Sequence, residues 1–113
     1  MFRRFLAASA FAAMAAAATP AFAQCDTTFT LANASGVTIM ELYFSSSNNS
    51  NWGNDRLGSN VLPAGRQMTF QPRPGGRYDF RAVFENGSSV ERRGVDLCSV
   101  STVTVQRGGI SAN

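Results

Sequence analysis

The sequence predicts an all-β protein: a single antiparallel β-sandwich, or a partly open barrel, of six to seven strands behind an N-terminal signal peptide. Three observations lead to this prediction. Short runs alternate apolar residues with polar ones, and turn residues separate them at intervals of about eight to twelve positions. After residue 24, no stretch has the three-to-four-residue apolar spacing of an amphipathic helix.

Residues 1–23 have the composition of an export signal. They begin with Arg3 and Arg4, continue with an alanine-rich apolar run and end with the small-x-small sequence Ala21-Phe22-Ala23. A membrane-spanning helix needs roughly 20 strongly apolar residues, and this run is shorter. We therefore expect cleavage before Gln24, with general secretion favoured over the twin-arginine route. We expect the product to be periplasmic or secreted and to have no membrane contact after cleavage.

Removal of the leader changes the charge. The chain has ten basic residues, all arginine, and seven acids; two arginines leave with the leader, so the mature net charge is +1. So small a charge gives no reason to expect nucleic acid or an anionic membrane as a partner. About 90 residues remain, enough for one domain with one small core.

Cys25 and Cys98 stand at opposite ends of the mature domain, and we expect them to form a disulfide because exported proteins meet an oxidising compartment. Closing a loop of about 74 residues would restrict the unfolded chain by roughly 4 kcal/mol. The alternative is a lipid-modified Cys25 at the new N-terminus. It is disfavoured because Gln24 stands where a small residue is required and because Cys98 would be left unpaired.

The first two strands are predicted on either side of a turn. Thr27–Ala32 alternates polar and apolar residues and reads as a strand, and Asn33–Gly36 is a turn. Val37–Phe44 is largely apolar on both faces, which indicates a central strand or a strand at a sheet packing. A polar loop, Ser45–Asn60, follows it.

Two proline- and glycine-rich breakers enclose the next strand. Pro63–Gly65 precedes Arg66–Gln71, which presents Met68 and Phe70 on one face. After the second breaker, Arg77–Glu85 alternates strictly. Its predicted core face is Tyr78, Phe80, Ala82 and Phe84, and its predicted outer face is Arg77, Asp79 and Arg81.

Asn86-Gly87 is the strongest turn signal in the chain. A two-residue loop would place Glu91 opposite the core residue Ala82. A three-residue loop with Gly87 in the left-handed conformation pairs Ala82 with Val90 instead, so we predict that hairpin.

The C-terminal part contains a predicted bulge and a last strand. Arg93-Gly94 is assigned as a β-bulge because the apolar residues before and after it have opposite parity. Val100–Gln106 is the last predicted strand. Residues 107–113 carry no pattern and are expected to be a flexible tail, so the predicted organisation is 1–23 signal peptide, 24–106 β-sandwich domain and 107–113 tail.

The missing residue types exclude most enzyme chemistry. Without His there is no Ser-His-Asp or Cys-His nucleophile system and no His-ligated metal, and without Lys there is no Schiff base. A pair of carboxylates, as in glycoside hydrolases, remains conceivable. Nothing in the spacing selects two from Asp26, Glu41, Asp55, Asp79, Glu85, Glu91 and Asp96. We therefore expect a protein that is not an enzyme and has no cofactor and no metal.

The loop Ser45–Asn60 is the most unusual segment. In a functional reading its oxygen-rich side chains hold Ca²⁺ or contact a glycan, with Trp52 as a stacking platform. In a structural reading its Asn and Ser residues satisfy their own backbone, and Trp52 and Leu57 plug the core edge. Calcium is disfavoured because Asp55 is the only carboxylate, and we expect Trp52 to be largely buried. The candidate binding residues are Asn48, Asn49, Asn51, Trp52, Asn54 and Asp55.

The arginines present a second choice. Arg77 and Arg81 share an outward face, and Arg92 and Arg93 lie across the hairpin. Guanidinium groups in a row can bind anions. The interspersed acids favour instead a solvated sheet face of mixed charge.

Four segments of the chain carry a resemblance. They are Glu41–Ser45 (ELYFS), Trp52–Gly58 (WGNDRLG), Leu62–Gly65 (LPAG) and Val95–Cys98 (VDLC). Together they resemble a family of small exported bacterial proteins that share a W-G-x-D-x-L-G stretch, an L-P-x-G turn and a D-L-C ending. The resemblance covers residues 25–105 and includes no catalytic signature. It implies a periplasmic single-domain protein in which Trp52, Asp55, Leu57 and Gly58 form a structural corner.

These observations lead to an expected function. We expect an exported non-catalytic β-domain that binds an envelope protein or a cell-envelope polymer, or has a structural role in the periplasm or cell envelope. The alternative is a small glycan-binding or Ca²⁺-dependent domain that uses loop 45–60.

Overall fold

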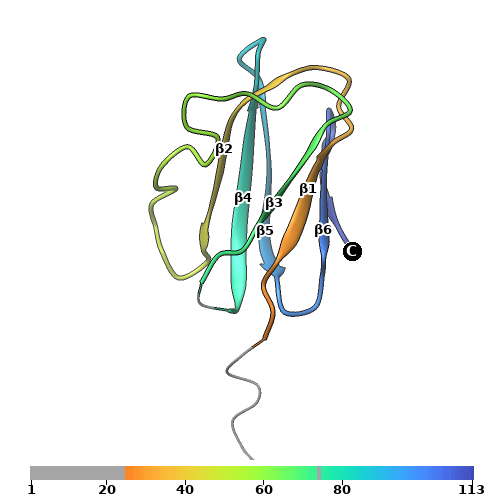
Figure 1. The fold of residues 1–113 in the computed structure, drawn as a ribbon. Helices are drawn as coiled ribbons and strands as arrows, with labels where there is room; N and C mark the ends of the chain where they lie inside the picture. The colour runs from red at the N-terminus through yellow and green to blue at the C-terminus, as the bar shows by residue number, and fades with distance from the viewer. Residues whose placement is uncertain (1–24, 74) are drawn as a thin grey trace, which may run out of the picture.

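The computed structural model describes residues 25–73 and 75–113, which form two packed β-sheets and no helix (Figure 1). The predicted signal peptide, residues 1–23, lies outside the described residues. Within them, no helix is long and apolar enough to cross a membrane. The strands are β1 (Phe29–Asn33), β2 (Ile39–Ser46), β3 (Gln67–Phe70), β4 (Arg77–Phe84), β5 (Ser89–Asp96), β6 (Thr102–Gln106) and β7 (Gly109–Ala112).

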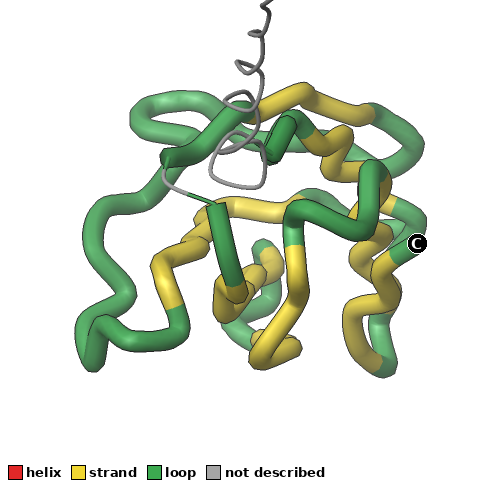
Figure 2. Tube along the Cα trace, turned by 90° about the horizontal axis from the view of Figure 1, so that it is seen from below, coloured by secondary structure: helices red, strands yellow, loops and turns green. Residues whose placement is uncertain are grey.

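The two sheets have the strand orders β3-β1-β6-β7 and β2-β4-β5. Figure 2, a view from below, shows the strand segments joined by long loops. The predicted all-β sandwich of six to seven strands is therefore confirmed. One pairing departs from the antiparallel expectation: β1 and β6 run parallel, with Thr30 beside Thr102.

The core lies between the sheets and follows the predicted alternation. All four residues predicted for the core face of β4 are at most 3% exposed. The ring of Phe29 on β1 packs edge-on against Phe44 and Phe80 of the other sheet, with centroids 5.3 and 5.4 Å apart. Such aromatic pairs add to the free energy of burial, so they fix how the two layers face each other.

Of the two alternatives predicted for Val37–Phe44, a strand at a sheet packing is the one found, because Ile39, Leu42 and Phe44 of β2 are buried in the core between the sheets. Among the named strands β2 pairs with β4 alone, with one isolated bridge from Ile39 to Leu62 on its other side, so it is an edge strand and not a central one. It also begins at Ile39 and continues through Ser46. Its apolar composition suggested a second neighbouring strand, but the following loop covers its free edge instead.

The predicted hairpin between β4 and β5 is confirmed. Ala82 pairs with Val90, the N–H of Phe84 donates to the carbonyl of Ser88 at 2.8 Å, and Gly87 has a φ of 89°. The predicted bulge is present too, because the register shifts between Tyr78 and Phe80, opposite Arg93-Gly94. Gly94 has a φ of 70°, a conformation that favours glycine.

The expectation of a flexible tail at 107–113 is wrong. Gly109–Ala112 forms β7, which pairs with β6, and Ile110 is 6% exposed in the core. The backbone of Asn113 also exchanges hydrogen bonds with Thr102. β7 has only four residues and one large apolar side chain, so its sequence pattern is too short to predict a strand. The segment is ordered by its pairing with β6.

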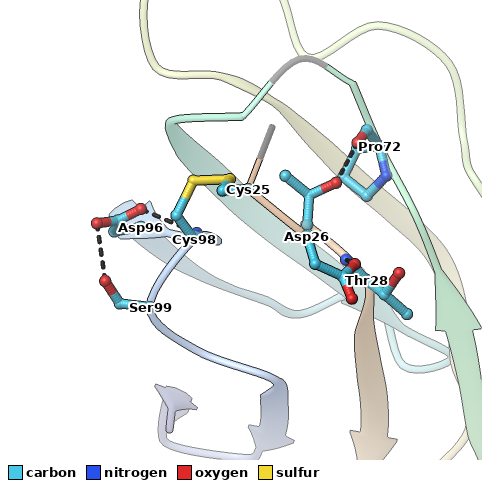
Figure 3. Close-up of a disulfide and its surroundings, with 8 residues drawn as sticks. Cys25, Asp26, Thr28, Pro72, Asp96, Cys98 and Ser99 are labelled. Carbon is cyan, nitrogen blue, oxygen red and sulfur yellow. Dashed lines mark hydrogen bonds between the residues drawn. A yellow bond between two sulfur atoms is a disulfide. The ribbon is translucent and has the colours of Figure 1, made fainter. Parts of the chain in front are cut away.

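The predicted disulfide joins Cys25 to Cys98, whose Cα atoms are 5.4 Å apart (Figure 3). Oδ1 of Asp96 accepts a hydrogen bond from the N–H of Cys98, and Oδ2 accepts one from the hydroxyl of Ser99, both at 2.9 Å. Gly75 lies directly against the bridge. A Cβ atom at that position would stand 2.7 Å from Sγ of Cys25, so the site admits no side chain without displacement.

Candidate functional site

The loop of residues 47–60 lies beside the free edge of β2 (Figure 1). The N–H of Leu42 donates to Oδ1 of Asp55 at 2.9 Å, and the carbonyl of Leu42 accepts from the N–H of Arg56 at 2.6 Å. Further along, the Arg56 guanidinium donates to the carbonyl of Phe44 at 2.8 Å. Unpaired backbone N–H and C=O groups on a strand edge can pair with a strand of another chain. Here the backbone groups of Leu42 and Phe44 are paired with residues of the loop instead.

Asp55 also fixes the shape of the loop. The same Oδ1 accepts the N–H of Leu57 at 2.9 Å, and the N–H of Gly58 donates to the carbonyl of Asp55 at 3.1 Å. Leu57 is 3% exposed and packs into the core, as the structural reading predicted. Asp55, Leu57 and Gly58 therefore form a structural corner.

Trp52 does not occupy the predicted position. It is only partly buried and lies outside the core cluster, so the expectation of a largely buried plug is wrong. The guanidinium carbon of Arg93 lies 5.0 Å from the centroid of the Trp52 ring. Leu57 already fills the core edge, so the loop places Trp52 over the β2-β4-β5 sheet as a partly exposed aromatic surface.

Asp79 lies beneath the beginning of this loop and is 6% exposed, although its place in β4 predicted a solvated outer face. It accepts hydrogen bonds from the hydroxyl of Ser47 at 2.7 Å and from the N–H of Gly94 at 2.9 Å, and it pairs with Arg93 at 3.1 Å. Burial acts to raise the pKa of Asp79, but the hydrogen bonds and Arg93 outweigh it. The pKa therefore lies below its usual value, and the carboxylate stays ionised at neutral pH.

The four candidate asparagines of the loop, Asn48, Asn49, Asn51 and Asn54, are exposed. Oδ1 of Asn49 accepts the N–H of Asn51 at 3.1 Å, and the N–H of Asn49 donates to the carbonyl of Ser46 at 2.8 Å. The loop thus satisfies part of its own backbone. In the described part of the chain, no three His, Cys, Asp or Glu side chains come together as metal ligands.

The arginines of β4 and β5 form ion pairs within their sheet and one hydrogen bond between the sheets. Arg81 pairs with Glu91 at 2.9 Å, and Arg93 pairs with Glu91 at 3.2 Å. Arg92 donates to the carbonyl of Ile110 at 3.1 Å and so ties β5 to β7. The face that carries Arg81, Glu91 and Arg93 has the mixed charge that the sequence favoured.

A second arrangement joins residues that sequence reasoning did not combine. A pocket of about 240 Å³ opens between the end of β2, loop 47–60, the turn before β4 and the start of β4. Only Asn49 among its lining residues was a sequence candidate, because segments far apart in the chain meet here. The lining residues are Ser45, Ser46, Asn49, Arg56, Pro72, Arg73 and Tyr78.

The resemblance motifs outside the loop also have structural roles. Leu62 is buried and forms a bridge with Ile39, and Leu97 is buried beside the disulfide residue Cys98. No protein-family model, no curated protein and no solved structure significantly matches this chain.

Proposed function

We propose that this chain is an exported, non-catalytic β-sandwich that binds another protein or a polymer of the periplasm or cell envelope through the surface around Trp52. One observation carries the proposal: Trp52 is a partly exposed aromatic side chain on a loop that is firmly attached to the sheet. Aromatic anchors held in one conformation lose little entropy on binding, and they often dominate interfaces.

The compartment is part of the proposal. A disulfide-linked cysteine pair is typical of proteins that work outside the cytoplasm. The leader-like composition of residues 1–23 supports export to the periplasm or beyond. Intact mass of the exported protein tests this step, since cleavage before Gln24 gives a defined new N-terminus.

The side chains near Trp52 support a binding role over a catalytic one. Asp79 and Glu91 are brought together, since both bind the guanidinium of Arg93. A carboxylate pair in a glycoside hydrolase needs one member that is protonated at working pH, through a raised pKa. The pKa of Asp79 is lowered instead, and both carboxylates are engaged by an arginine.

The experiment compares the native protein with Trp52→Ala in crosslinking and co-purification from the cell envelope. The variant keeps the fold, because Trp52 is outside the core, and it loses the partner. Val61→Ala is the matched control, since Val61 is an exposed apolar residue at 42%. Retention of every partner by a folded Trp52→Ala protein would exclude this surface.

Glycan binding by the same loop is the second candidate, and the partly exposed ring of Trp52 among exposed asparagines favours it. Sugars stack on aromatic rings and bind amide groups. A panel of neutral glycans, with Ca²⁺ as a separate addition, should then raise the unfolding midpoint of the native protein but not of Trp52→Ala. An unchanged midpoint in all cases rules out this candidate.

A further inference from the structure

The pocket between the end of β2 and the start of β4 is independent of the Trp52 surface and has a different chemistry. Two of its seven lining residues are arginines, Arg56 and Arg73, and none is an acid. Ser45, Ser46 and Asn49, which also line it, have neutral side chains that can donate hydrogen bonds. A concave site with two positive charges and neutral donors is suited to a negatively charged group.

Arg56 is held in place before any ligand arrives. Its guanidinium donates to the carbonyl of Phe44 at 2.8 Å and lies 4.3 Å from the centroid of the Phe44 ring. The side chain of Phe44 is only 2% exposed, so the ring that supports the Arg56 guanidinium is fixed by the core. A guanidinium has five N–H donors, and one contact leaves others for a ligand.

The acids of the molecule do not neutralise this pocket. Across residues 25–73 and 75–113, the ion pairs join Arg81 and Arg93 to Asp79 and Glu91. Arg56 and Arg73 form no ion pair among these residues. Their charges therefore remain available to an ion from solution or to the charged end of a larger molecule.

The size of the pocket limits the ligand. About 240 Å³ is below the range of roughly 300–1,000 Å³ that drug-sized ligands occupy. A single carboxylate or phosphate group fits such a space, whereas a whole sugar unit with its neighbours does not. We propose that this pocket binds an oxyanion, a carboxylate or phosphate group, between the guanidinium groups of Arg56 and Arg73.

The test is a titration of the exported protein followed by ¹⁵N–¹H NMR, with inorganic phosphate in one arm, acetate in a second and chloride at matched ionic strength in a third. Saturable shifts at Asn49, Arg56 and Arg73 are expected with phosphate, acetate or both. Saturation by phosphate alone identifies a phosphate site, and saturation by acetate alone a carboxylate site. Shifts that do not saturate, or that chloride reproduces, overturn the proposal.

Charge-matched variants complete the experiment. Arg73→Gln should weaken saturation about tenfold or more, because a hydrogen bond to a charged group is lost. Arg66→Gln removes the same charge from an exposed residue outside the pocket and should leave the affinity unchanged. Equal weakening by both variants would show general charge attraction and would overturn the assignment. Arg56→Gln serves as a further variant, with its NMR spectrum reporting whether the fold is kept.

Discussion

The carboxylate of Asp55 and the backbone N–H of Leu42 are joined by a hydrogen bond of 2.9 Å, although the residues are 13 positions apart. The same oxygen accepts the N–H of Leu57. The Asp55 side chain therefore accepts one hydrogen bond from within the loop and one from a backbone N–H on the free edge of β2. Asp55 thus holds the loop against the edge of the sheet.

Replacing Asp55 tests this role. Asp55→Ala leaves the N–H groups of Leu42 and Leu57 without their acceptor and should lower the free energy of unfolding by about 1–3 kcal/mol. Asp55→Asn keeps an oxygen acceptor and should cost less. Urea denaturation measures both, with exposed Asn54→Ala as a neutral control. Equal stability of Asp55→Ala and the native protein would contradict the role.

Trp52 and Leu57 lie on the same loop, and their substitutions should differ. Trp52→Ala loses a contact with Arg93 and partial packing, about 1 kcal/mol. Leu57→Ala opens a cavity in the core and should cost about 2–5 kcal/mol. Thermal unfolding by circular dichroism orders the two variants. A larger loss from Trp52→Ala would show that Trp52 supports the core after all.

Asp79 should make stability depend on acid pH. Its pKa is lower in the folded protein than its ordinary value, so its ionised form stabilises the fold above about pH 4. That contribution is lost as the pH falls through the lower folded-state pKa. Asp79→Asn should therefore be less stable than the native protein at pH 7, and the difference should shrink below pH 4 or so.

Denaturant titrations between neutral and acid pH check this sign. Glu85→Gln removes an exposed acid at the hairpin and is the matched control, with a difference from the native protein that stays small throughout. A gap between Asp79→Asn and the native protein that widens on acidification would reverse the assignment.

Reduction of the disulfide should lower the free energy of unfolding by about 4 kcal/mol, because the bond closes a large loop in the unfolded chain. Unfolding midpoints with and without reductant measure the loss. The double variant Cys25→Ala, Cys98→Ala should match the reduced protein. An unchanged unfolding midpoint after complete reduction, verified by intact mass, would show that the disulfide does not stabilise the fold.

The order of the C-terminal strand can be tested at Ile110. Ile110→Ala should destabilise the protein by about 2 kcal/mol or more, because its side chain is buried against the core. Ser111→Ala, one position along β7, should change little. If neither variant lost stability, the result would support the flexible tail that the sequence predicted for residues 107–113.

The sequence predicted those parts of the fold in which local pattern and core burial agree. The alternation from Tyr78 to Phe84 fixed the face of β4. The parity change around Gly94 located the bulge, and the pairing of Ala82 with Val90 followed from keeping charge off the core. In each case a register shift of one residue would turn a buried apolar side chain toward solvent, so the alternative registers are costly in free energy.

The errors fall where distant segments decide the outcome. Asp79 looked solvated because its strand neighbours are charged, but Ser47 and Arg93 cover it from elsewhere in the chain. Trp52 looked like a core residue because of its size, but Leu57 occupies that place. The oxyanion pocket had no sequence signature, because Arg56 and Arg73 meet only once the sandwich has formed.

The parallel pair of β1 and β6 has a consequence for how the protein folds. These strands are central in their sheet, yet they must find each other across most of the chain, and long-range pairing of this kind is slow. Cys25 and Cys98 each stand four residues before the first residue of their strand, Phe29 and Thr102. Once the disulfide has formed, it holds the N-terminal ends of β1 and β6 close together. The two strands can then pair residue by residue in the parallel direction. Folding of this pair is thereby coupled to the oxidation of Cys25 and Cys98.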